Sequence, residues 1–193
     1  APSGLALVTD KPAADATWTG RIDSVTRLSG LDVFEGFFGE AWTLGIADGR
    51  PMAVVLVKIG ETDDRTLKLI AQKLTAAVGR TLDLVARIAA WEFGMILPDT
   101  DIKGGLAVAE KMHKTLESAM PELPVDVCFG VASIVPNEKG NAQSFFELCQ
   151  RAAEAAQREG DGRIAFVTDG GKFALHASAD MVDWDPAETG TGQ

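Results

Sequence analysis

The stretch RTLDLVARIAAWEFGMILPDTD, residues 80–101, decides the fold. Two apolar runs, at 82–88 and 92–98, stand on either side of the tripeptide AAW. Apolar runs of strand length that flank so short a connection predict a β-hairpin. A single acid, Glu92, follows the bulky Trp91 at the turn. The question is whether this hairpin forms a catalytic site, a site that has lost its chemistry, or ordinary structure.

Segments with helical and strand periodicity alternate on both sides of the hairpin. Helices are predicted where apolar residues recur every three or four positions, and strands where short apolar runs are bounded by turn residues. In chain order, the segments are a helix and turn at 31–51, a strand at 52–59, a helix at 63–80, the hairpin, a helix at 101–120, a strand at 124–135, a helix at 142–160 and a strand at 162–168. This order predicts an α/β (α+β) fold with a central mixed sheet of about five strands flanked by helices.

The length of 193 residues suits one domain that buries a sizeable core without disulfides or metal. Residues 1–18 are predicted to be an N-terminal linker or peripheral strand, and residues 19–170 the domain itself. Residues 171–193 are rich in Asp, Gly and Thr, and are predicted to be an acidic flexible tail.

Composition excludes several classes of function. The formal net charge of −10 disfavours nucleic acid as a partner, and no apolar run approaches the roughly 20 residues that span a bilayer. Cys128 and Cys149 lie in apolar sequence and are typical of buried thiols in a reducing compartment, so we expect a cytoplasmic protein. His113 and His176 have no Cys or His partner at metal-binding spacing, so neither a metal site nor a cofactor is expected.

Several short motifs, in order, resemble the GGDEF family of diguanylate cyclases, which condense two GTP molecules into cyclic di-GMP on a palm-like α/β domain. The resemblance covers roughly residues 20–168. DSVTRLSGLDVF is similar to the family's opening motif and keeps its Asp, Thr, Leu and Phe. LPDTD, AEKM and FGVAS are similar to later family motifs. The family's signature hairpin is matched by a degenerate version whose residues after Arg87 and Ile88 are Ala89, Ala90, Trp91, Glu92 and Phe93.

The resemblance implies that the catalytic site has been lost. In the family, carboxylates from the first strand and the signature loop hold divalent metal against the triphosphate. Here Lys58 stands at the first-strand position and Trp91 replaces one loop acid, which leaves Glu92 alone. The connection after the first strand is roughly ten residues shorter than the family's guanine-reading segment. The late family motif is reduced to RAAEAAQREG, without its Asp, Tyr and Lys. We therefore expect no catalytic residues and no cyclase activity.

The resemblance also points to a second site. Many cyclases carry an Arg-x-x-Asp site that binds the product, a fixed number of residues before the signature. Arg80 and Asp83 occupy those positions here. Lys111 lies where the family often has an Arg that assists the same site. A guanidinium can donate hydrogen bonds to the O6 and N7 of guanine or to a phosphate, and a carboxylate can accept hydrogen bonds from its N1–H and N2 amino groups. The pattern alone has little value, since Arg158 and Asp161 form a second match. The alternative is that Arg80 faces the end of a helix and pairs with Asp83 in a solvated ion pair.

The sequence thus leads to two hypotheses of different classes. The first is a catalytically inactive domain that binds cyclic di-GMP through Arg80, Asp83 and Lys111 and so regulates self-association or a protein partner. The alternative is a protein-interaction or dimerisation module that binds no nucleotide and uses the hairpin, with Trp91 at its tip, as a contact surface. Residual catalysis is a third reading, which requires Glu92 and magnesium or manganese.

Overall fold

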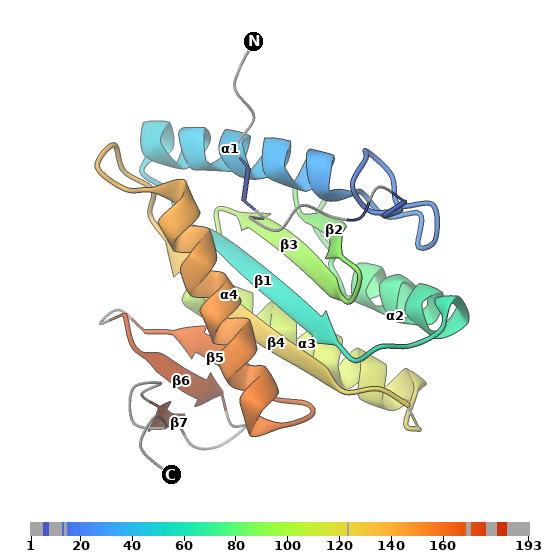
Figure 1. Ribbon diagram of the computed structural model, residues 1–193. Coiled ribbons are helices and arrows are strands. Elements are labelled where there is room, and N and C mark those ends of the chain that lie inside the picture. Colours follow the sequence, from blue (N-terminus) through green and yellow to red (C-terminus); the bar gives the residue numbers. More distant parts are fainter. Residues whose placement is uncertain are drawn as a thin grey trace.

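The computed structural model describes residues 6–7, 13, 15–122, 124–168, 171–176 and 181–184. The predicted order of helices and strands is confirmed as far as the fifth strand (Figure 1). The helices are α1 (Leu31–Asp48), α2 (Asp64–Ala77), α3 (Ile102–Ala119) and α4 (Ala142–Glu159). The strands are β1 (Met52–Ile59), β2 (Leu84–Ala89), β3 (Glu92–Pro98), β4 (Val127–Ile134), β5 (Ile164–Val167), β6 (Phe173–His176) and β7 (Met181–Trp184).

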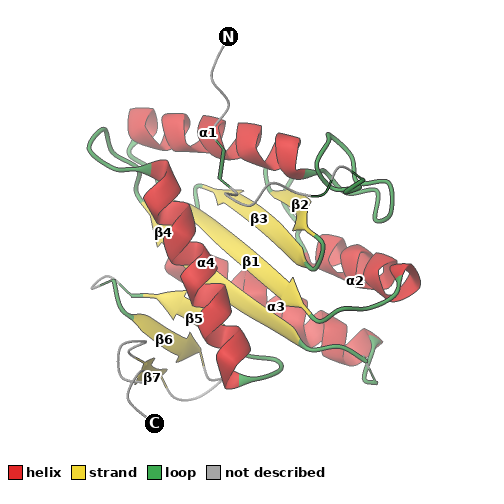
Figure 2. Cartoon of the chain, in the orientation of Figure 1, coloured by secondary structure: helices red, strands yellow, loops and turns green. Residues whose placement is uncertain are grey.

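The strands form one mixed sheet in the order β2-β3-β1-β4-β5-β6-β7. Only the pair β4 and β5 is parallel among the described strands, and α4 supplies the crossover between them. Helices α1 and α4 cover one face of the sheet, and α2 and α3 cover the other (Figure 2). The predicted fold class, a mixed sheet between helices, is confirmed.

Two strands extend the sheet beyond the predicted five. β6 pairs antiparallel with β5, and β7 pairs antiparallel with β6. Both lie in the segment expected to be a flexible tail from residue 171, so that expectation is wrong for these two strands. The physical reason is burial: Phe173 and Ala174 are 2% and 0% exposed, with Phe173 under Arg151 of α4 and Ala174 in the core, which the acidic composition of the surrounding sequence obscures. Residues 177–180 and 185–193 of the predicted tail lie outside the described part of the chain.

Strand β1 lies inside the sheet, between β3 and β4, and is buried on both faces. Val55 and Val57 pack against α2 and α3, whereas Val54 and Leu56 pack against α1 and α4. Because both faces of the strand are covered, its sequence is a continuous apolar run instead of an alternating one. Lys58, near the end of the strand, is the one charged residue in this apolar run.

Glycines permit the closest contacts between helices and sheet. A Cβ on Gly130 of β4 would lie 2.3 Å from the backbone nitrogen of Ala153 on α4. A Cβ on Gly105 of α3 would lie 2.8 Å from Val131. Gly105, which would ordinarily weaken a helix, is therefore accommodated because it allows α3 to pack onto β4. None of the helices that the structure describes combines the length and hydropathy of a membrane span.

Candidate functional site

The signature hairpin forms as predicted, with a turn at Ala90 and Trp91 between β2 and β3. The pairing shifts register between Arg87 and Ala89, so a β-bulge precedes the turn. The indole of Trp91 is partly buried and packs against the core on the α2 and α3 face. Its backbone carbonyl accepts a hydrogen bond from the Ile59 amide at 2.9 Å. Trp91 therefore belongs partly to the packing of the domain, which weakens the hypothesis of an exposed aromatic tip.

Lys58 and Glu92 face each other across β1 and β3. They are register partners, and Lys58 Nζ lies 3.6 Å from Glu92 Oε2, with side chains 22% and 13% exposed. Burial raises the pKa of the Glu92 carboxyl, the Lys58 charge opposes that rise, and Glu154 adds to it. Glu92 Oε1 is buried without a hydrogen-bond partner among the described residues. The lone acid of the signature thus has an ammonium group as its nearest charged partner.

The surroundings of this pair contain few further metal ligands. No group of three His, Cys, Asp or Glu side chains that could hold a metal ion is found among the residues that the structure describes. On the opposite side of β1, the register partner of Lys58 is Cys128. Burial raises the pKa of the Cys128 thiol to about 11, so this side chain stays a neutral thiol.

The connection from β1 to α2 consists of residues 60–63, which agrees with the short connection expected from the sequence. Both of its ends are held. The amide of Gly60 donates to the carbonyl of Asp126 at 3.0 Å, and the Asp63 carboxylate caps α2 by accepting from the Thr66 amide at 2.7 Å. A connection of this length leaves no room for the guanine-reading segment expected in the family.

Arg80 and Asp83 do lie together, in the turn between α2 and β2. Arg80 Nη2 donates to Asp83 Oδ1 at 3.1 Å, to the Pro98 carbonyl at 2.8 Å and to Thr100 Oγ1 at 2.5 Å. The Arg80 side chain is 53% exposed, but that of Asp83 is only 3% exposed. The guanidinium is thus held in one orientation at the surface, whereas the carboxylate expected to face guanine is covered by Arg80.

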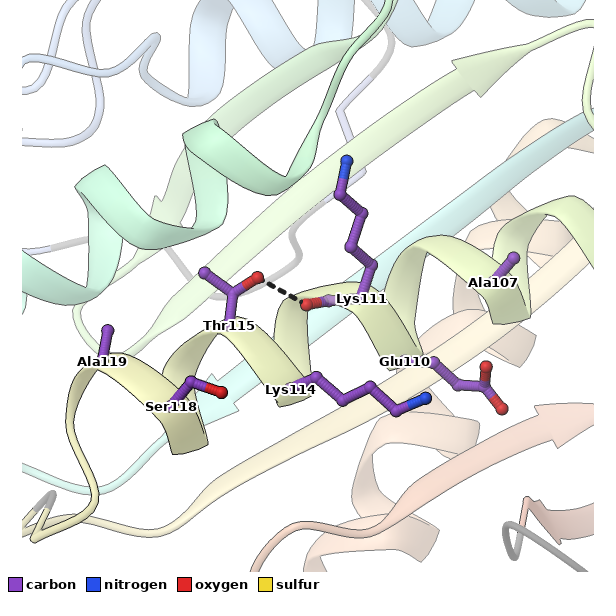
Figure 3. Close-up of a pocket in the computed structure, with 7 residues that line it drawn as sticks. All are labelled: Ala107, Glu110, Lys111, Lys114, Thr115, Ser118 and Ala119. Carbon is purple, nitrogen blue, oxygen red and sulfur yellow. Dashed lines mark hydrogen bonds between the residues drawn. The ribbon is translucent and has the colours of Figure 1, made fainter.

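Lys111 lies apart from this pair. It is exposed on α3, ten residues beyond the Asp101 cap and hence about 15 Å along the helix from it. It contributes to a shallow hollow of about 690 Å³ on the surface of α3. Figure 3 shows Lys111 and Lys114 leaving the helix in different directions, with Thr115 donating to the Lys111 carbonyl. No contact joins Lys111 to Arg80 or Asp83 in the described part of the chain, and Arg80 bonds Thr100 just before α3 begins, so a ligand that reached all three would have to extend along α3.

The site also contains a buried network that sequence reasoning did not single out. Asp23 is 0% exposed and accepts hydrogen bonds from the hydroxyls of Thr17 and Thr26, each at 2.6 Å. Arg87 Nη1 donates to both Asp23 oxygens at 3.1–3.2 Å, and Arg87 Nη2 donates to the Ala90 carbonyl in the hairpin turn at 2.8 Å. Arg87 therefore connects the segment around Asp23 to the turn of the signature hairpin through hydrogen bonds. The available signal was an Asp followed three residues later by Thr, a pattern typical of a local side-chain to backbone turn.

The Asp23 carboxylate makes the domain sensitive to acid. Burial by itself raises its pKa, but the hydrogen bonds from Thr17 and Thr26 and the Arg87 charge outweigh burial and lower the pKa from 3.8 to about 2. Because the folded pKa lies below the ordinary value, the stabilisation is present above about pH 4 and is lost as pH falls through 2. We expect Asp23 to contribute about 2 kcal/mol at neutral pH.

Urea unfolding between about pH 5 and pH 2 measures this contribution. Asp23→Asn removes the titrating group, and should flatten the pH dependence of the unfolding free energy over that range. The control is Asp32→Asn, at an exposed position in the first turn of α1. Equal slopes for Asp23→Asn and wild type would contradict the assignment.

Comparison with known proteins places this geometry in a family. The model of the diguanylate cyclase GGDEF domain matches residues 21–163. A comparison with curated proteins finds no match. Among solved structures, the chain is similar to the FimX GGDEF domain from Pseudomonas aeruginosa, at 19% identity and a TM-score of 0.68, covering 75% of this chain and 98% of that one.

Two further structures extend the comparison. The coiled coil and GGDEF domain of DgcB from Caulobacter crescentus, in complex with c-di-GMP, matches at 18% identity and a TM-score of 0.66, covering 76% of this chain and 85% of that one. Diguanylate cyclase SiaD from Pseudomonas aeruginosa, in complex with its activator SiaC, matches at 17% identity and a TM-score of 0.68, over 77% of this chain but only 62% of that one. At these identities the structures support the fold, while the family model covers most of the sequence. The chain belongs to the GGDEF domain family.

Proposed function

We propose that this GGDEF domain does not synthesise cyclic di-GMP but binds it, and so acts as a receptor in the cytoplasm. The observation against synthesis is the ion pair between Lys58 and Glu92. Two-metal phosphoryl transfer requires carboxylates that ligate the metal ions, and an ammonium group at this position repels a divalent cation. The four-residue connection after β1 also leaves no segment to bind guanine as the family does.

The observation that carries the receptor proposal is the orientation of Arg80. Its guanidinium is fixed by Asp83, Pro98 and Thr100 yet remains half exposed. A pre-oriented guanidinium loses little conformational entropy when it binds the guanine edge or a phosphate. The structure of DgcB was solved in complex with c-di-GMP, which supports the same ligand here.

The three predicted ligand-binding residues have different roles in this proposal. Arg80 contacts the ligand, and Asp83, being almost covered, is a positioning residue that holds Arg80. Lys111 adds positive charge from α3, and reaches only a ligand large enough to cover the distance between them. Cyclic di-GMP in an intercalated dimer, the form expected at such sites in the family, is a ligand of this kind. Bound ligand would then regulate self-association or docking to a protein partner.

Isothermal titration of the domain with cyclic di-GMP tests the proposal. We expect micromolar or tighter binding that Arg80→Ala weakens roughly ten-fold or more, because the charge-assisted contact of the guanidinium with the ligand is lost. Arg158→Ala is the matched control, since Arg158 lies in the second Arg-x-x-Asp match, where Asp161 accepts from the Val127 amide. Because Arg80→Ala uncovers Asp83, its thermal unfolding is measured alongside, and Arg80→Lys, which keeps the charge, provides a milder variant. Absence of binding to wild type would instead favour the protein-interaction module.

Incubation with GTP tests the loss of synthesis separately. With magnesium or manganese present, we expect no cyclic di-GMP from the wild-type domain, as measured by chromatography of the nucleotides. An active GGDEF cyclase serves as the positive control. Product formation that disappears in Glu92→Gln would show residual catalysis and overturn this part of the proposal.

A further inference from the structure

A groove beside α1 has no role in the proposed function. It has a volume of about 280 Å³ and lies between the C-terminal half of α1, the start of β1 and the segment before β2. Leu44 and Leu82 line it at 61% and 73% exposure. They are the two most exposed large hydrophobic side chains in the part of the chain that the structure describes. Two such side chains beside one concave, mostly apolar surface are unusual for a surface that faces only water.

The apolar surface of helix α1 is wider than its contact with the core, which explains the groove. Phe34 and Phe38 are fully buried on the face that packs against the sheet and α4. Phe37, Ala41 and Leu44, spaced by four and three residues, line the groove, but Ala41 also belongs to the buried core and Phe37 packs against it, whereas Leu44 is exposed. A surface helix needs only one apolar face to pack on its own domain. The apolar stripe of α1 thus extends past the core to the exposed Leu44, as in a helix that makes a further contact.

The charges at the rim indicate what kind of partner fits. Glu40 and Asp48 are exposed acids on α1, eight residues and therefore about 12 Å apart. No ion pair involves either of them among the described residues. The third rim acid, Asp99, is paired with Arg50 at 3.1 Å. The groove thus presents an apolar centre between two acids that have no ion-pair partner in the part of the chain that the structure describes.

We propose that this groove binds an amphipathic helical segment of a partner protein, with apolar side chains seated between Leu44 and Leu82. Two Lys or Arg side chains about two turns apart on that segment face Glu40 and Asp48. Helix-in-groove recognition uses this combination of apolar anchors and flanking charge. The inference does not depend on cyclic di-GMP, although Leu82 lies between Arg80 and Asp83 in the chain.

Selection from a random library of helical peptides, displayed on phage, tests the proposal without ligand present. Peptides are selected on the wild-type domain after depletion on the Leu44→Ser, Leu82→Ser double variant, which changes only exposed positions. We expect the selected peptides to share apolar residues between two basic residues seven or eight positions apart. In fluorescence anisotropy, the double variant and Glu40→Lys should each weaken their binding roughly ten-fold or more. Leu69→Ser, at a partly exposed position on α2, is the control and should have no effect.

Three results would overturn the proposal. The first is a failure to enrich any peptide that prefers wild type to the double variant. The second is selected peptides with no basic residues or with acidic ones, which would mean that the rim charges do not select the partner. The third is wild-type self-association in analytical ultracentrifugation that the double variant abolishes, which would assign the groove to a second copy of the chain. Each result is independent of the titration with cyclic di-GMP.

Discussion

Replacing Arg87 by leucine is expected to destabilise the domain by about 3–5 kcal/mol, because it leaves the fully buried Asp23 carboxylate without its cationic partner. The loss includes the hydrogen bond to the Ala90 carbonyl in the signature turn. It also includes the stacking of the guanidinium over Trp18, 5.0 Å from the ring centre. The measurement is the free energy of unfolding in urea at neutral pH.

The double variant Asp23→Leu, Arg87→Leu separates the ion pair from the rest of the site. Removing both charges leaves no isolated buried carboxylate, so its destabilisation should be smaller than the sum of the two single effects by about 1–3 kcal/mol. Arg65→Leu, at an exposed position on α2, controls for the loss of an arginine. Additive effects would mean that Asp23 and Arg87 do not act as a pair.

Lys58→Asp is expected to have the second large effect. The substitution restores the acid of the family's first strand, but it places a carboxylate against Glu92, which burial already disfavours in its charged form. We expect a loss of about 3–5 kcal/mol, since a favourable pair becomes two like charges in a poorly solvated place. Lys58→Met, which removes the charge without adding another, should cost less.

The pH dependence of Lys58→Asp gives a second readout with a definite sign. Like charges raise the pKa of one of the two carboxyls, and a raised pKa in the folded state favours the folded protein at low pH. The deficit relative to wild type should therefore be greatest near about pH 8 and shrink as pH falls toward about 5. Addition of magnesium or manganese should not reverse it. A large rise in thermal stability with either metal would show that one substitution rebuilds a metal site, and would count against the proposed loss of catalysis.

Much of the fold was predictable because its signals are local. Strand β1 is a single apolar run, and α2 begins at Asp64, directly after Asp63, whose side chain caps it. The hairpin was readable from two apolar runs separated by three residues. Strands β6 and β7 were not predicted, since each has only four residues and both lie in polar sequence. Their pairing depends on β5, a contact that no local pattern reports.

The site was predictable in position but not in its contacts. The resemblance placed Lys58 at the first-strand position and Glu92 in the signature loop, and the register of β1 with β3 is what brings the two side chains together. It also placed Arg80 beside Asp83, but it did not indicate that Arg80 covers the carboxylate. Whether a side chain faces solvent or its neighbour depends on packing from distant segments, here the carbonyl of Pro98 and the hydroxyl of Thr100.

Strand β6 bears on where the folded unit ends. The family match stops at residue 163, before β5, and the domain limit predicted from composition at residue 170 lies before β6. A chain shortened to either point would leave an open sheet edge: β4 in the first case and β5 in the second. Unpaired edge strands with apolar side chains template association between molecules. Strand β6 covers the edge of β5, so we expect any shortened form of this domain to stay monodisperse more readily if it retains at least residues 173–176.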